Sequence, residues 1–203
     1  MLTVYICIAV LVAVAVTGGS LRRLAEIRIR RAWLLWTALA VQILIISVIP
    51  DATPALLAVL HIASYLAAGA CLVINRNLPG IWMVGLGGAL NGVVIAVNGG
   101  SLPASADALR AAGRPVATGR FANSAVLPDP HLALLGDVFA TPPWVPGHSV
   151  FSVGDLAIWV GVGVLFWRTC HVSANLGGRH RDLLIGGAVS ARPAPRHRVG
   201  TTP

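Results

Sequence analysis

The segment FSVGDLAIWVGVGVLFWR, residues 151–168, decides the fold class because it reads as a membrane-spanning helix. A backbone inside lipid must satisfy its own hydrogen bonds, and an apolar run of this length does so as a helix. Asp155 lies about one turn inside the start of the run, and Asp137 lies in a second apolar run, LLGDVF (134–139). Ionisable side chains at such positions are costly, so the two aspartates are the first indication of a functional site.

The composition extends this reading to the whole chain. The 203 residues are 56% hydrophobic and 11% charged, with a mean hydropathy of +0.79. A soluble domain is about one quarter charged. The sequence therefore predicts an all-α, polytopic membrane helix bundle with five transmembrane helices, at 2–19, 32–49, 54–74, 78–97 and 152–167.

The distribution of basic residues predicts the orientation. The net charge is +8, and all fifteen basic residues are arginines. Twelve of them fall on one side of the five predicted spans and three on the other. Because arginine-rich segments stay in the cytoplasm, we expect the N-terminus outside and the C-terminus inside a bacterial cytoplasmic membrane. Charge arranged in this way indicates topology, and no nucleic-acid partner is expected.

The domain organisation follows from the spans. Residues 1–168 form the predicted transmembrane bundle, including a long outer loop at about 98–150. Residues 169–203 are rich in arginine, glycine and proline and are expected to be a basic, disordered cytoplasmic tail. Within the loop, 105–113 predicts a short helix with Ser105 as N-cap and Gly113 just beyond its end. A second helix is expected at 129–139, with Asp129 as cap and Pro130 at its first position.

Several polar side chains fall in the outer halves of the predicted spans. Polar residues in spans usually face the bundle interior, so they predict an outward-facing polar site. Each has a structural alternative: His61 as a hydrogen-bonded bundle histidine, Asn91 and Gln42 as interhelical hydrogen-bonding groups, and residues 98–100 as a turn. In the functional interpretation, orienting or substrate-binding roles fall to His61, Asn91, Asn98, Gly99, Gly100 and His148.

Two interpretations of the aspartates are open. Ser152-x-x-Asp155 fits a capping box, in which case Asp155 is structural and Asp137 is an exposed loop charge. Alternatively, the two acids form a catalytic pair that shares a water molecule. Two acids in a low-dielectric pocket do not both ionise easily, so one keeps a proton and the other becomes the base. Such a pair would activate water and protonate a leaving group.

The strings LLGDVF and FSVGDLAIWVGVG carry a resemblance to the C-terminal part of signal peptidase II, the lipoprotein signal peptidase. In that family an aspartate followed by Phe precedes a last helix that opens Phe-Asn-x-Ala-Asp. The resemblance implies water activation by Asp137 and Asp155 for peptide cleavage beside a lipid anchor. The chain as a whole, with NRNLPG, NGG, GDVF and FSVGD, more closely resembles a family of small bacterial membrane proteins of unknown function.

These observations favour an aspartate-dependent, hydrolase-like enzyme, such as a peptidase, that acts on a lipid or lipid-linked substrate at the outer leaflet. Membrane lipid is the expected partner, and neither a cofactor nor a metal is expected. One alternative is a non-catalytic membrane protein that binds a lipid or a partner helix. A second is a metal-free acid catalyst acting on an isoprenoid. A metal site made of two histidines and two carboxylates is a further alternative for Asp137, Asp155, His131 and His148.

Overall fold

The computed structural model describes residues 2–116 and 123–171, so the predicted tail lies outside the described residues from residue 172 onward. A 3-10 helix, η1 (Leu21–Glu26), follows the first long helix, and a π-helical segment, η2 (Leu44–Val48), continues the second. The five long helices are α1 (Leu2–Val16), α2 (Trp33–Ile43), α3 (Pro54–Ile74), α4 (Ile81–Val97) and α6 (Val153–Cys170).

Helices occur at all five places where the sequence predicted them. Two of these helices, α3 and α6, are long and apolar enough to cross a membrane. With 21 residues, α3 extends about 31 Å, close to the thickness of a hydrocarbon core. The other three apolar helices are shorter, at 17 residues or fewer. The described part of the chain is therefore mostly helical, with two candidate membrane spans.

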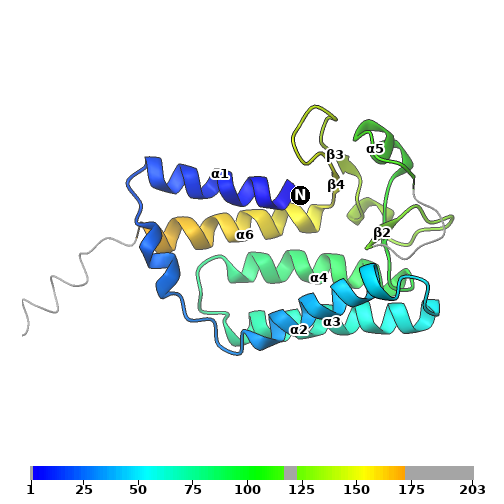
Figure 1. Cartoon of the computed structure of the whole chain (residues 1–203), viewed down its shortest axis with the longest axis horizontal. Helices are drawn as coiled ribbons and strands as arrows, with labels where there is room; N and C mark the ends of the chain where they lie inside the picture. The colour runs from blue at the N-terminus through cyan, green and yellow to red at the C-terminus, as the bar shows by residue number, and fades with distance from the viewer. Residues whose placement is uncertain (1, 117–122, 172–203) are drawn as a thin grey trace, which may run out of the picture. The chain divides into compact units, whose positions relative to one another are not determined.

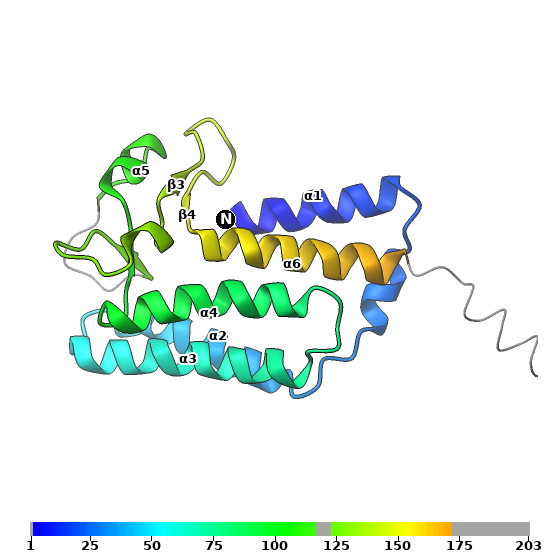
Figure 2. The ribbon, with the colours of Figure 1, turned by 180° about the vertical axis from the view of Figure 1, so that it is seen from behind.

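The long helices pack in an order that differs from their order in the sequence. α1 packs on α6, α6 on α4, α4 on α3, and α3 on α2 (Figure 1). The same order is seen from behind in Figure 2. The contact between α4 and α6 is the most extensive, and glycines allow it. A β-carbon on Gly87 would strike the Gly154 carbonyl oxygen, and one on Gly161 would lie 2.7 Å from the backbone nitrogen of Val84.

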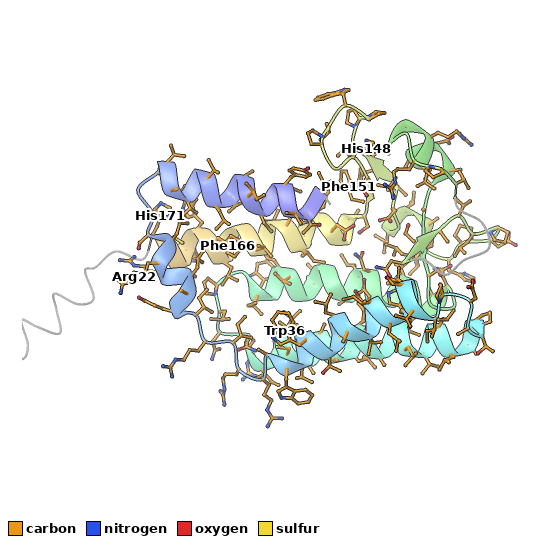
Figure 3. All side chains as sticks on the ribbon, in the orientation of Figure 1. Arg22, Trp36, His148, Phe151, Phe166 and His171 are labelled. Atoms are coloured by element: carbon orange, nitrogen blue, oxygen red, sulfur yellow. The ribbon has the colours of Figure 1, made fainter. Side chains whose placement is uncertain are left out.

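The two ends of the helices have different chemistry. Arg22 and His171 lie at one end, and His148 and Phe151 lie at the other (Figure 3). We call the first the arginine end, because η1 and the last turn of α6, which both carry arginine, lie there. We call the second the loop end, because residues 98–152 join the end of α4 to the start of α6 there.

Short strands and one short helix organise the loop. β1 (Leu102–Pro103) pairs in parallel with β2 (Ser124–Ala125), and β3 (Phe139–Ala140) pairs antiparallel with β4 (Val150–Phe151). The helix predicted at 105–113 is confirmed as α5 (Ala106–Ala111). Its Ser105 hydroxyl accepts a hydrogen bond from the Ala108 N–H at 3.3 Å, and Gly113 has φ +63°.

The helix predicted at 129–139 is wrong, because only a 3-10 turn, η3 (Ala133–Leu135), forms there. Tertiary hydrogen bonds use the backbone groups that a helix would need. The Asn98 side chain accepts from the His131 N–H and donates to the His131 carbonyl, both at 2.8 Å. Further along, the Asp137 N–H donates to the Pro103 carbonyl at 2.8 Å. The loop therefore folds against the end of α4 and not as a separate helix.

Candidate functional site

Asp155 lies in the first turn of α6, where the capping box predicted by the sequence is confirmed. The Ser152 Oγ accepts from the Asp155 N–H at 3.0 Å, and the Asp155 Oδ2 accepts from the Ser152 N–H at 2.9 Å. The same residues also bind α4. Asn91 donates from Nδ2 to the Asp155 Oδ1 at 3.1 Å and accepts from the Ser152 hydroxyl at 2.9 Å. Asp155 is thus a cap and also one member of a network between two helices.

Asp137 is buried, which contradicts the interpretation as an exposed loop charge. It is 6% exposed, and its backbone is held on both sides, by the Pro103 carbonyl and by the Ser105 N–H. Its Oδ1 is buried without a hydrogen-bond partner among the described residues, as is the Ser124 hydroxyl. Burial raises the pKa of Asp137 to about 6. The nearby Ser124 hydroxyl lowers this pKa, although it makes no regular hydrogen bond to the carboxyl group, and the charge of Asp155 raises it further.

The two aspartates influence each other electrostatically. The charge of Asp155 contributes to the raised pKa of Asp137, and the charges of both aspartates extend to Tyr65 of α3. Asp155 is nevertheless hydrogen-bonded to Ser152 and Asn91, so the arrangement is a cluster and not a directly bonded carboxyl pair. We call Asp137, Asp155 and Tyr65 the acidic cluster. An acid with a raised pKa beside an acid held by hydrogen bonds is an arrangement that suits proton transfer.

His61 is a fully buried histidine of α3 that holds the turn after α4. Its Nδ1 donates to the Gly100 carbonyl at 2.6 Å, and its ring meets the Tyr65 ring edge-on with centroids 5.4 Å apart. Gly100 has φ +99°, a conformation that favours glycine, and it lies against Ala58. The interpretation of His61 as a hydrogen-bonded bundle histidine is confirmed, and the histidine links α3 to the loop beside the acidic cluster.

The other predicted site residues differ in their surroundings. Asn98 holds the loop at His131, and Gly99 follows it with φ +67° in the turn that ends α4. The His148 Nδ1 bonds to the Pro143 carbonyl at 2.9 Å, within the segment that joins β3 to β4. Gln42 donates to the Ser64 hydroxyl at 3.2 Å, which confirms it as an interhelical hydrogen-bonding group. These residues therefore contact the loop or a neighbouring helix.

Three residues of this region were given no site role by the sequence. The spacing of His61, Ser64 and Tyr65 at i, i+3 and i+4 predicts a polar patch on one helix face, but it assigns no role to Tyr65. Ser152 was assigned only as a cap, although its hydroxyl is fully buried and donates to Asn91. No sequence signal indicated Ser124, because strand pairing between residues far apart in the chain places it there. Over residues 2–116 and 123–171, no group of three metal-binding side chains forms.

Comparison with known proteins agrees with part of the sequence interpretation. A family of unknown function, DUF5317, matches residues 26–167. An uncharacterized protein of Thermotoga maritima is 32% identical over 94 residues, which cover 45% of this chain. The chain covers 53% of the length of that relative. No solved structure matches the chain. These findings give no support to the local resemblance to signal peptidase II, whereas they support the resemblance to a family of unknown function. The chain belongs to the DUF5317 family.

Proposed function

We propose that this protein is a membrane-embedded, aspartate-dependent hydrolase that acts on a lipid or lipid-linked substrate at the outer face of the membrane. The observation that carries the proposal is Asp137. This buried acid has a raised pKa, and its Oδ1 has no hydrogen-bond partner among the described residues. Burying a carboxyl group without a partner is unfavourable, and ionisable groups perturbed in this way cluster at functional sites.

The two acids are suited to different roles. With its pKa raised to about 6, Asp137 retains a proton in a useful fraction of molecules near neutral pH. Asp155 accepts hydrogen bonds from Ser152 and Asn91, which suit a carboxylate. Asp155 then takes a proton from water as the water oxygen bonds to the substrate carbonyl carbon. Asp137 gives its proton to the leaving group as the bond to that group breaks.

The membrane placement is part of the proposal. Five apolar helices would cross the bilayer, with the N-terminus and the loop end outside and the arginine end inside. Arginines flank the arginine end, and three tryptophans near it are exposed, as expected where helices meet a membrane interface. They are 58%, 69% and 68% exposed, at Trp33, Trp36 and Trp82.

Reporter fusions test this orientation. Alkaline phosphatase fused at residue 113, in the loop, is expected to be active, because it folds only outside the cytoplasm. Green fluorescent protein fused at residue 77, in the turn between α3 and α4, is expected to fluoresce, because it folds inside. The reverse pattern at both positions would exclude the outer-face assignment, and activity of one reporter at both would exclude a five-span topology.

The enzymatic proposal is tested with the full chain in vesicles made from a total bacterial lipid extract. Mass spectrometry is expected to show conversion of a lipid or lipid-linked peptide that falls by about a hundredfold or more in Asp137→Asn and in Asp155→Asn. Because Asp137 must hold a proton, wild-type turnover is expected to fall as the pH rises above about 6. Asp107→Asn is the matched control, since its carboxylate is exposed and pairs with Arg110 on α5. Folded variants that retain full turnover would exclude catalysis by these acids.

A further inference from the structure

A cavity lies between α3 and α4. Of the acidic cluster, Tyr65 lines this cavity and the two aspartates do not. Its volume is about 650 Å³, within the range of ligand sites. Its lining runs along α4 from Val84 to Ala96, which is about 18 Å at 1.5 Å per residue. Almost all of the lining is apolar, and the polar exceptions are Gln42 and Tyr65. We call this cavity the α3–α4 groove.

Glycines make the groove wide in its middle. Apart from the backbone of its own helix, a β-carbon added at Gly69, Gly85 or Gly88 would meet no atom of the described residues within 4 Å. Toward the loop end the groove narrows, because a β-carbon on Gly92 would lie 3.2 Å from the Tyr65 ring. The space is therefore an apolar groove whose two polar lining residues lie together toward the loop end, because Tyr65 faces Gly92 and Gln42 binds Ser64, the neighbour of Tyr65.

We infer that the α3–α4 groove holds one hydrocarbon chain of a membrane lipid, with the polar part of that lipid directed toward Tyr65 and the loop end. An apolar slot with polar groups at one end matches an amphiphile, because the chain and the polar part each meet groups of their own kind. A transmembrane helix from a second copy would also fit the glycines, and the labelling experiment below distinguishes the two occupants. Only the use of the bound lipid as a substrate rests on the proposed function.

Substitutions that fill the α3–α4 groove test the inference. The probe is a phosphatidylglycerol that carries a photoreactive diazirine in one acyl chain, added to the full-length protein in detergent. Wild-type cross-links are expected to concentrate on the facing sides of α3 and α4. Gly88→Leu is expected to lower this labelling by about tenfold or more, because the leucine side chain occupies the open space. Gly85→Leu is a second variant of the same design, in case the first fails to fold.

Val59→Leu is the control, because Val59 is an exposed residue of α3 that does not line the groove. It is expected to label like wild type. Equal labelling of all variants, or cross-links spread over every exposed apolar face, would overturn the inference. Loss of a wild-type dimer in Gly88→Leu, without lipid cross-links in wild type, would assign the groove to a second copy and also overturn it.

The acid variant separates this inference from the enzymatic proposal. Asp137→Asn leaves the groove unchanged, so its labelling is expected to equal that of wild type while its lipid turnover is lost. Normal labelling together with normal turnover in Asp137→Asn would remove the enzymatic proposal and leave a lipid-binding groove. Normal turnover in wild type without labelling of the groove would remove the lipid-binding inference and leave the enzymatic proposal.

Discussion

Replacing Gly87 with alanine is expected to destabilise the helical part of the chain by about 3 kcal/mol or more, at the upper end of the range for overpacked cores. The new methyl group would meet the Gly154 carbonyl oxygen and would lie 2.8 Å from the Ile158 Cγ1 and 2.9 Å from the Ile158 nitrogen. Two of these three atoms belong to the backbone of α6, so the conflict is relieved only by moving one helix away from the other. That movement also displaces Asn91 from its bonds to Ser152 and Asp155.

The neighbouring glycine provides the control. Among the described residues, a methyl group on Gly88 meets no atom of a neighbouring segment within 4 Å, and alanine is favoured over glycine inside a helix by up to about 1 kcal/mol. Gly88→Ala is therefore expected to be neutral or slightly stabilising. The measurement is reversible unfolding of each purified variant in detergent, followed by circular dichroism. If Gly87→Ala unfolds at the same point as Gly88→Ala, the close contact between α4 and α6 is not present in the protein.

Replacing Asp137 with asparagine is expected to stabilise the folded protein at pH 7.5, by at most about 3 kcal/mol. Burial raises the pKa of Asp137 from 3.8 to about 6. A difference of about two units corresponds to about 3 kcal/mol that the fold loses when this carboxyl ionises. Asparagine has nearly the same shape and carries no charge. A gain in stability with a loss of turnover would be typical of a residue retained for function.

The direction of the pH dependence follows from the same pKa. Between about pH 4 and pH 6 the folded protein retains a proton on Asp137 that the unfolded chain has released, so wild-type stability falls as the pH rises through this window. Above about pH 6 this contribution has been lost, and below about pH 4 it is fully present. Unfolding free energies measured from pH 4 to 8 are expected to show a smaller slope in Asp137→Asn than in Asp107→Asn. If Asp137→Asn is less stable than wild type at pH 7.5, the carboxylate is structural.

Local signals in the loop predicted some elements and failed for others. The capping box of α6 and the cap of α5 were predictable because each bond joins residues three apart in the chain. The helix expected at 129–139 had a cap and a proline in suitable positions. It does not form because Asn98, from another part of the chain, binds both backbone groups of His131. The preference of a short segment for helix contributes little free energy when tertiary hydrogen bonds compete with it.

The sequence by itself determined the mostly helical fold and the positions of the five long helices, because apolar runs must pair their own backbone groups wherever water is excluded. Only the tertiary structure decided the surroundings of the aspartates. It buried Asp137 through pairing with Pro103 and Ser105, and it brought Asn91 to Asp155 through the glycine contact of α4 with α6. These effects depend on which segments meet across long stretches of chain. Hydrophobic periodicity and residue spacing describe one segment at a time, so they do not predict which distant segments come into contact.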